Sequence, residues 1–264
     1  MKPARSFVVP AQMILLVSLC FGQQPYSTLK QAGPRSLLIA LNCKPADRPA
    51  LRRAIQTSAV SRLSALAKDG ALRSYRVLFN RFVDTDTWDA LIVLEFSGDA
   101  GSQTWAAIEA VSPAGLDPEA AKLLTAGVTY QADLVSHQEL PPQAGSGKHV
   151  YLVIPYTIDP NSPDDYVKYA QGYVVPQLQG WMKEGVLSRW DLFVSRYAAG
   201  RPWQAALVLE YRDEAAFGRR DEVIAKVRSD LAQNAEWKAI SDNKHKMRTE
   251  LRAVTAEELI LNPK

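Results

Sequence analysis

The chain carries WDALIVLEF at residues 88–96 and WQAALVLEY at residues 203–211. Both stretches begin with Trp, continue through small and branched apolar residues, and end on Glu followed by an aromatic residue. Such a short, continuous apolar run is typical of a buried β-strand. The two stretches lie 115 positions apart, which suggests that a longer unit is repeated.

At the same spacing, Ser36–Phe96 aligns with Tyr151–Tyr211 without a gap. Identical residues recur at helix ends, turns and strand interiors, among them Pro45/Pro160, Gly70/Gly185, Arg81/Arg196, Trp88/Trp203 and Glu95/Glu210. Matches at helix ends, turns and strand interiors favour a duplication over a chance resemblance.

Each copy is predicted to be a βαββαβ unit. First strands are expected at residues 37–43 and 151–158, each followed by an amphipathic helix. These helices end at Gly70 and Gly185, where a left-handed helix end leads directly into the next strand. That strand, at residues 72–82 and 187–197, should form a hairpin with the WDALIVLEF or WQAALVLEY strand. A second helical region and closing strands at 130–137 and 247–254 complete the two units.

The sequence divides into five segments. They are a signal peptide at 1–22, a lead-in at 23–35, the first unit at 36–140, a linker at 141–148 and the second unit at 149–264. The linker is rich in Pro and Gly. In the leader, Lys2 and Arg5 precede an apolar stretch from Phe7 to Phe21, which is short for a stable membrane span. Export to the periplasm or outside the cell is therefore expected.

Composition limits the partners and cofactors. Removal of residues 1–22 lowers the formal net charge from +3 to +1, too little to attract nucleic acid or an anionic membrane. Cys20 follows Leu19, where a lipoprotein signal has a small residue, so no lipid anchor is expected. Cys43 is then the only cysteine left, which excludes an internal disulfide and a cysteine-based zinc site. We expect neither a metal nor another cofactor.

Two βαββαβ units in one chain resemble the dimeric α+β barrel superfamily, which includes antibiotic-biosynthesis-monooxygenase-like, NIPSNAP-like and EthD-like families. The resemblance rests on the order of the elements, the Gly70 and Gly185 turns and the two Trp-to-Glu strands. It implies an α+β fold in which two ferredoxin-like sheets meet face to face and enclose a cavity, here within one polypeptide. Burial favours the same pairing, because a sheet covered by helices on one side leaves its other face bare.

A hairpin with Phe82 opposite Trp88 would place one set of side chains on the cavity face of the sheets. The candidate ligand-binding residues from this set are Tyr75, Phe79, Arg81, Glu95, Trp190, Arg196 and Glu210. The alternative is that the charged members, which lie near strand ends, are solvated. Trp88 and Trp203 are interpreted as packing anchors.

The resemblance also implies a haem-like alternative, because haem-degrading members of the superfamily use an Asn on the first strand, a Trp after the third and a His before the last. Asn42, Trp105 and His245 occupy such places here. The set is split between the two copies, and His245 lies in a basic stretch where a solvated His is the simpler interpretation.

No nucleophile elbow, zinc-binding helix motif, phosphate loop or dinucleotide fingerprint occurs in the sequence. The leading hypothesis is therefore an exported protein that binds a small, apolar or aromatic molecule. One alternative is a cofactor-independent monooxygenase or isomerase, in which one polar group moves a proton. Another is a structural or assembly protein with a filled barrel and no pocket.

If the leader is cleaved as expected, the mature chain begins near Gln23. N-terminal sequencing of the protein recovered from the periplasm or the medium checks this directly. Recovery of Met1, or of a lipid on Cys20, would contradict the prediction.

Overall fold

The computed structural model describes residues 35–141, 148–158 and 163–260. The predicted signal peptide and nearly all of the predicted lead-in and linker lie outside these residues. Within the described part of the chain, no helix is long and apolar enough to cross a membrane.

The first half contains four strands and four α-helices. Its elements are β1 (Arg35–Cys43), α1 (Arg48–Ala54), α2 (Val60–Lys68), β2 (Leu72–Asn80), β3 (Ala90–Phe96), α3 (Asp99–Val111), α4 (Pro118–Ala121) and β4 (Leu124–Glu139). A π-helical turn at Ile55–Ala59 joins α1 to α2. Gly70 has a φ of 77°, so the predicted left-handed end of α2 is confirmed.

The second half follows the same order, with its last strand in two pieces. Its elements are β5 (Val150–Ile158), α5 (Pro163–Tyr169), α6 (Val175–Lys183), β6 (Leu187–Ser195), β7 (Ala205–Tyr211), α7 (Glu214–Gly218), α8 (Arg220–Leu231), α9 (Ala235–Asn243), β8 (Arg248–Glu250) and β9 (Val254–Glu258). A π-helical turn at Ala170–Val174 joins α5 to α6. Gly185 has a φ of 74° at the predicted helix end.

Eight strands close into an antiparallel barrel in the order β7-β6-β4-β1-β3-β2-β9-β5, with β5 pairing back to β7. The short β8 adds to β5 beyond β9. The two halves are joined by the β4–β6 pairing, where Leu134 faces Phe193, and by the β2–β9 pairing, where Leu78 faces Glu258. The predicted α+β barrel is thus confirmed at the level of its strands and helices.

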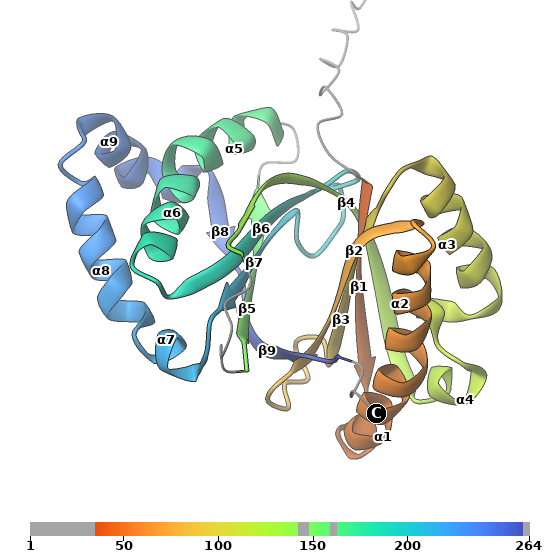
Figure 1. Cartoon of the computed structure of the whole chain (residues 1–264). Coiled ribbons are helices and arrows are strands. Elements are labelled where there is room, and N and C mark those ends of the chain that lie inside the picture. The colour runs from red at the N-terminus through yellow and green to blue at the C-terminus, as the bar shows by residue number, and fades with distance from the viewer. Residues whose placement is uncertain (1–34, 142–147, 159–162, 261–264) are drawn as a thin grey trace, which may run out of the picture. The chain divides into compact units, whose positions relative to one another are not determined.

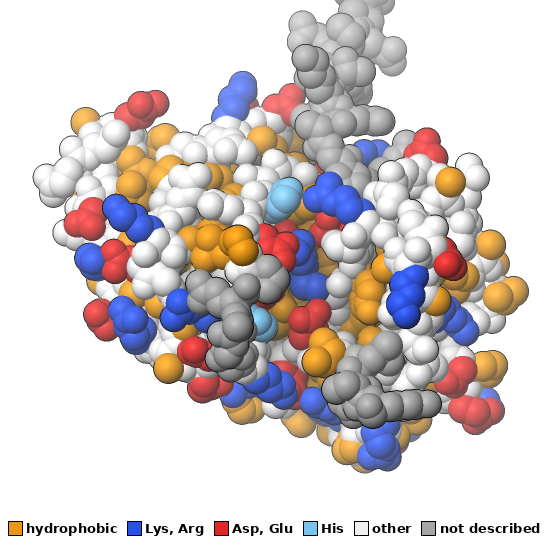
Figure 2. All heavy atoms as spheres, in the orientation of Figure 1, with side chains coloured by type: hydrophobic (Ala, Val, Ile, Leu, Met, Phe, Trp, Pro, Cys, Tyr) orange, Lys and Arg blue, Asp and Glu red, His pale blue; other side chains and the backbone are white. Residues whose placement is uncertain are grey.

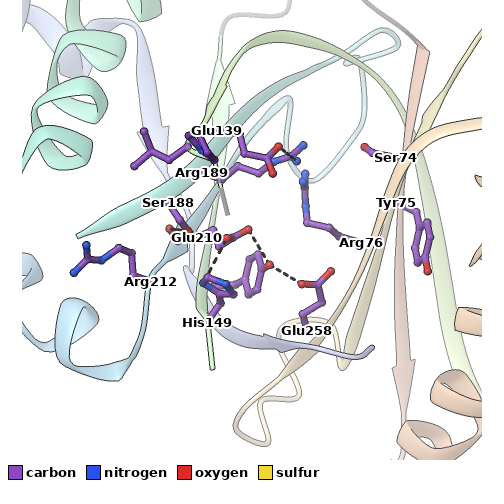
Figure 3. A pocket seen from close by; sticks show the side chains of 13 residues that line it. Ser74, Tyr75, Arg76, Glu139, His149, Ser188, Arg189, Glu210, Arg212 and Glu258 are labelled. Atoms are coloured by element: carbon purple, nitrogen blue, oxygen red, sulfur yellow. Dashed lines mark hydrogen bonds and ion pairs between the residues drawn. The ribbon is translucent and has the colours of Figure 1, made fainter. Parts of the chain in front are cut away.

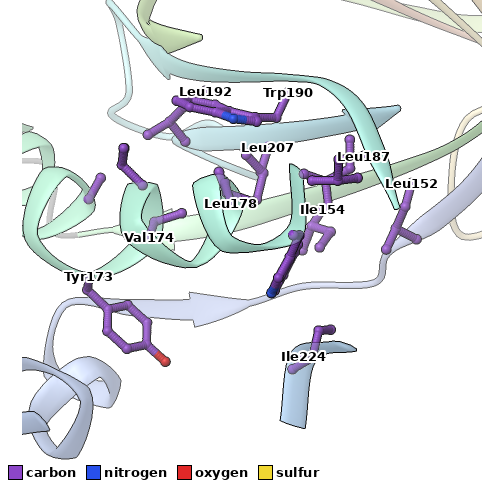
Figure 4. Close-up of a cluster of buried hydrophobic side chains, with 14 of the residues drawn as sticks. Leu152, Ile154, Tyr173, Val174, Leu178, Leu187, Trp190, Leu192, Leu207 and Ile224 are labelled. Atoms are coloured by element: carbon purple, nitrogen blue, oxygen red, sulfur yellow. The ribbon is translucent and has the colours of Figure 1, made fainter. Parts of the chain in front are cut away.

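Helices cover the barrel on two opposite sides (Figure 1). Under α1 to α4 lies an apolar cluster that includes Leu51, Ile55 and Leu63. Under α5 to α9 lies a larger cluster, in which Trp190 packs near Leu178 and Leu192 (Figure 4). A third cluster fills the inside of the barrel, formed by alternate strand residues such as Leu78, Leu91, Val93, Phe193 and Val208. The strands between helices and barrel interior are therefore buried on both faces.

The predicted hairpin register is wrong by one residue in both halves. In the first hairpin Leu78 faces Leu91, and in the second Phe193 faces Ala206. Because side chains alternate between the two faces of a strand, a slip of one residue exchanges its inner and outer sets. The closing strand of the second half was also misplaced, since β9 extends to Glu258 instead of ending at Val254.

We expect the halves to be inseparable. Residues 35–140 alone would expose the free edges of β2 and β4 and the apolar inner face that includes Leu38 and Leu91. This fragment should aggregate or form a homodimer that replaces the missing half, whereas the full chain should be able to exist as a monomer. Light scattering and urea unfolding distinguish these outcomes. A fragment that unfolds cooperatively as a stable monomer would contradict the expectation.

Candidate functional site

The barrel has a cavity at each end, and the two cavities share no lining residue. The polar mouth is the cavity of about 300 Å³ lined by Ser74, Tyr75, Arg76, Glu139, Leu140, Pro141, His149, Tyr151, Ser188, Arg189, Glu210, Arg212 and Glu258. The aromatic mouth is the cavity of about 520 Å³ at the other end, around Trp88, Tyr130 and Trp203. The apolar cluster inside the barrel lies between them. Figure 2 shows charged side chains and a His in the hollow between the two helical sides.

Opposite charges are buried together at the polar mouth. Arg76 on β2 forms an ion pair with Asp191 on β6, and the two side chains are 6% and 1% exposed. These strands lie on opposite sides of the eight-stranded barrel, so the pair spans its interior. Arg189 Nε lies 3.0 Å from Asp191 Oδ2, and Arg189 Nη2 lies 3.3 Å from Glu95 Oε1. Two positive and two negative side chains thus balance one another in a largely buried cluster, as buried charges require.

A phenol lies between two carboxyl groups in the same cavity (Figure 3). The Tyr151 hydroxyl is 2.9 Å from Glu210 Oε2 and 2.7 Å from Glu258 Oε2. Burial raises the pKa of Glu258, and the neighbouring Glu210 charge acts in the same direction. Burial also raises the pKa of Tyr151 well above its usual value, so the phenol is neutral.

Glu210 receives further polar contacts. Ser188 Oγ donates a hydrogen bond to its Oε1 at 2.7 Å, and His149 Nδ1 lies 3.5 Å from the same oxygen. The two carboxyl groups of the polar mouth therefore have different surroundings: Glu210 contacts Ser188, His149 and Tyr151, whereas Glu258 contacts the Tyr151 hydroxyl.

The aromatic mouth is chemically different. Tyr130 stacks on Trp203 with their ring centroids 3.9 Å apart and the ring planes inclined by 25°. The guanidinium group of Arg201 lies over the Tyr130 ring, 5.6 Å from its centroid. Leu38, Ala40, Leu91 and Val153 line the inner part of the cavity. Trp88 and Trp203 are half-buried: they pack against the apolar cluster inside the barrel, as predicted for packing anchors, and also form part of the cavity wall.

The structure places the predicted ligand-binding residues in different environments. Glu210 lines the polar mouth, and Glu95 is buried beside it, with Oε1 3.3 Å from Nη2 of the lining residue Arg189. On β2 and β6 the wrongly predicted register put residues on the wrong face. Phe79 and Trp190, which were expected in the cavity, are buried against the helices. Tyr75 packs partly against the helix side and touches the rim of the polar mouth.

The two predicted arginines lie beyond the ends of their strands. Arg81 pairs with Glu214, with 3.0 Å between Nη2 and Oε2, outside both barrel cavities. Arg196 pairs with Asp133, with 2.6 Å between Nη2 and Oδ1, beside a groove under α3. Neither arginine lines the polar mouth or the aromatic mouth.

The haem-like set is not brought together. Asn42 lines the aromatic mouth, where its amide donates a hydrogen bond of 2.5 Å to the Thr87 carbonyl. Trp105 lies on α3 and is buried in the apolar cluster on the helix side. His245 is exposed on the short turn after α9. Among the described residues, no group of three His, Cys, Asp or Glu side chains is arranged to hold a metal ion.

Sequence reasoning missed Arg76, Asp191, Tyr151 and Glu258. Arg76 and Asp191 lie 115 residues apart, the spacing of the repeat, so equivalent positions carry opposite charges inside otherwise apolar strands. That was a signal available in the sequence. No such signal marks Glu258, because the predicted closing strand ends at Val254 while β9 continues to Glu258.

Solved structures show the same fold at low sequence identity. A crystal structure described as "putative monooxygenase from Lactobacillus acidophilus NCFM" matches with a TM-score of 0.54 and 10% identity, over 86% of this chain and 94% of the other. An "anthrone oxidase-like protein" matches with a TM-score of 0.51 and 11% identity, over 86% of this chain and 91% of the other. No protein-family model and no curated protein matches the sequence. These likenesses establish the barrel fold.

The buried pair predicts a difference between two Asp residues. Asp191→Asn leaves Arg76 and Arg189 with too little negative charge in a buried site, so unfolding free energy should fall by about 3 kcal/mol. Asp133, the partner of Arg196, is more exposed than Asp191, so Asp133→Asn should lower the unfolding free energy by less than about 1 kcal/mol. Urea unfolding of both variants measures the difference. Equal losses would show that the charge cluster is not held as described.

Proposed function

We propose that this chain is an exported small-molecule-binding protein that holds a flat, largely apolar ligand in its aromatic mouth. The observation that carries the proposal is the 520 Å³ cavity at the end of the barrel, with Trp88, Tyr130 and Trp203 in its wall. Its size lies within the range of ligand pockets, which are mainly apolar and carry few polar groups. A structural protein with a filled barrel would not need such a space.

The polar groups at this mouth would orient the ligand. Asn42 lies at the end of β1, and Arg252 lies between β8 and β9. Arg252 is bound to Asp84 and Asp86 through Nη1, at 3.1 Å and 2.8 Å. A ligand carbonyl or hydroxyl at the rim could accept a hydrogen bond from either side chain, while the stacked rings contact its apolar face.

We also propose that the two halves arose by tandem duplication of a ferredoxin-like unit. The strand order is β4-β1-β3-β2 in the first half and β9-β5-β7-β6 in the second, which is the same arrangement of equivalent strands. The two π-helical turns, Ile55–Ala59 and Ala170–Val174, also lie at the repeat spacing. Such turns are rare, so finding them at equivalent positions supports a common origin.

A cofactor-independent monooxygenase or isomerase is the second candidate. Two neighbours in fold are described as monooxygenase or anthrone oxidase-like, although at 10% and 11% identity the likeness carries the fold alone. The specific observation in favour of an enzyme is the Glu210–Tyr151–Glu258 arrangement, because two carboxyl groups in different surroundings can act as acid and base.

Anthrone, a flat aromatic ketone, is a suitable probe of the aromatic mouth. Trp203→Ala removes the ring stacked on Tyr130 and should weaken anthrone binding by about tenfold. Trp190→Phe changes a Trp buried on the helix side and should leave the affinity unchanged. Isothermal titration calorimetry on folded variants gives the affinities. Absence of anthrone binding, or an equal effect of both changes, would count against this ligand site.

A further inference from the structure

The number of protons at Tyr151 is set by its two neighbours. A phenol carries one proton, so it can donate one hydrogen bond and must accept any second one. Its oxygen lies within hydrogen-bonding distance of Glu210 and of Glu258. The phenol proton can serve only one of them fully, so both contacts are satisfied as hydrogen bonds when one carboxyl group is protonated and donates to the phenol.

Of the two carboxyl groups, Glu258 is the better suited to carry the extra proton. Burial has the largest influence and raises its pKa, while the contacts with Tyr151 and Arg76 act in the opposite direction. Glu210 instead has Ser188 and His149 at its other oxygen, and the Ser188 hydroxyl donates to it. With Glu258 protonated, the hydrogen bonds would run from the Glu258 carboxyl group to the Tyr151 hydroxyl and from this hydroxyl to Glu210.

Arg76 adds unused donors to the same cavity. The residue is only 5% exposed and lines the polar mouth, and its Nη2 contacts Asp191. Its Nε and Nη1 are buried, and no hydrogen-bond partner for them occurs among the described residues. Buried donors of this kind are costly unless something accepts from them. A ligand oxygen in the cavity would be such an acceptor.

The other charges around the cavity favour a neutral ligand. They are Glu95 on β3, Glu139 on β4, His149 before β5, Arg189 and Asp191 on β6, Arg212 after β7, and Arg73 on β2, whose Nη2 lies 3.6 Å from Glu95 Oε2. Arg189 is bound to Glu95, Glu139 and Asp191, so much of this charge is already compensated. Neither sign is left in clear excess to recognise a charged substrate.

We propose that the polar mouth is a second, catalytic site that tautomerises small neutral 1,3-dicarbonyl compounds, with Glu258 as the acid, Glu210 as the base and Arg76 as the carbonyl-binding group. The cavity of about 300 Å³ is at the small end of ligand pockets. A carboxylate is a weak base, so the C–H bond must be acidic, and two flanking carbonyl groups make it so. This site is separate from the aromatic mouth and does not depend on the function proposed there.

The reaction moves two protons and needs no other reactant. In the keto-to-enol direction, Glu210 takes the proton from the carbon between the carbonyl groups, and the electrons of that C–H bond form the C=C bond. The carbonyl oxygen, held by Arg76, takes the proton of Glu258 as its C=O bond becomes single. Glu210 is then protonated and Glu258 ionised, and transfer through the Tyr151 hydroxyl restores both. The reverse direction uses the same groups.

Acetylacetone tests this site because its enol relaxes measurably to the keto form when an apolar stock is diluted into water. The full-length protein should accelerate the relaxation. The loss of the enol absorbance with time measures its rate. Glu258→Gln should lower kcat by about 100-fold, the usual size of a general-acid contribution. Tyr151→Phe keeps the packed ring but removes the hydroxyl through which the proton passes from Glu210 back to Glu258. kcat should therefore fall while KM stays unchanged. The wild-type rate should decline as pH rises and Glu258 loses its proton.

Glu257→Gln is the matched control. Glu257 is the adjacent residue on β9, and its carboxylate is paired with Arg52 and Lys148 away from the polar mouth. This variant should relax acetylacetone at the wild-type rate. Circular dichroism confirms that each variant is folded before rates are compared. No acceleration by the wild-type protein would overturn the proposal, as would equal rates in folded Glu258→Gln and Glu257→Gln variants. Anthrone binding is measured separately, so either site can fail without the other.

Discussion

The structure depends on the two antiparallel ladders that join its halves, β4 with β6 and β2 with β9. Each half brings a four-stranded sheet whose helices cover only one face, and the other face carries Leu38, Leu78, Leu91 and Val93 in the first half. The ladders turn these two apolar faces toward one another and leave no free edge in the eight-stranded ring. Burial of the inner face and satisfaction of the strand edges are thus achieved together.

Closure also determines where polar chemistry can occur. The middle of the barrel is filled by apolar side chains such as Phe193 and Val208, so charged groups can be placed only toward its ends. At one end Arg76 and Asp191 meet across the interior. Replacing a buried ion pair with apolar residues often leaves stability unchanged or raises it, so such a cluster is weak evidence of a stabilising role. Its position beside a cavity is the feature on which the proposed catalytic site rests.

Much of the fold was accessible from the sequence because its signals are redundant. The repeat, the glycines after the first helices and the apolar strand runs all indicate the same βαββαβ order. The hairpin register was not accessible, because residues 76–80 are buried on both faces and show no alternation that distinguishes inside from outside. Structure supplies the missing information through Asp89, whose carboxylate pairs with Arg48 and accepts a hydrogen bond from the Cys43 amide at 2.7 Å. These are contacts between distant segments, which local sequence patterns do not reveal.

The candidate sites differ in the same way. Glu95 and Glu210 could be found because they belong to the repeated strands, whereas Glu258 comes from the one strand that departs from the repeat and is split by residues 251–253. The polar mouth is asymmetric because Tyr151, Glu210 and Glu258 all come from the second half, and the repeat equivalent of Tyr151 is Ser36. The two carboxyl groups lie on different strands, β7 and β9, so their surroundings differ, and an acid and a base can arise only where such surroundings differ.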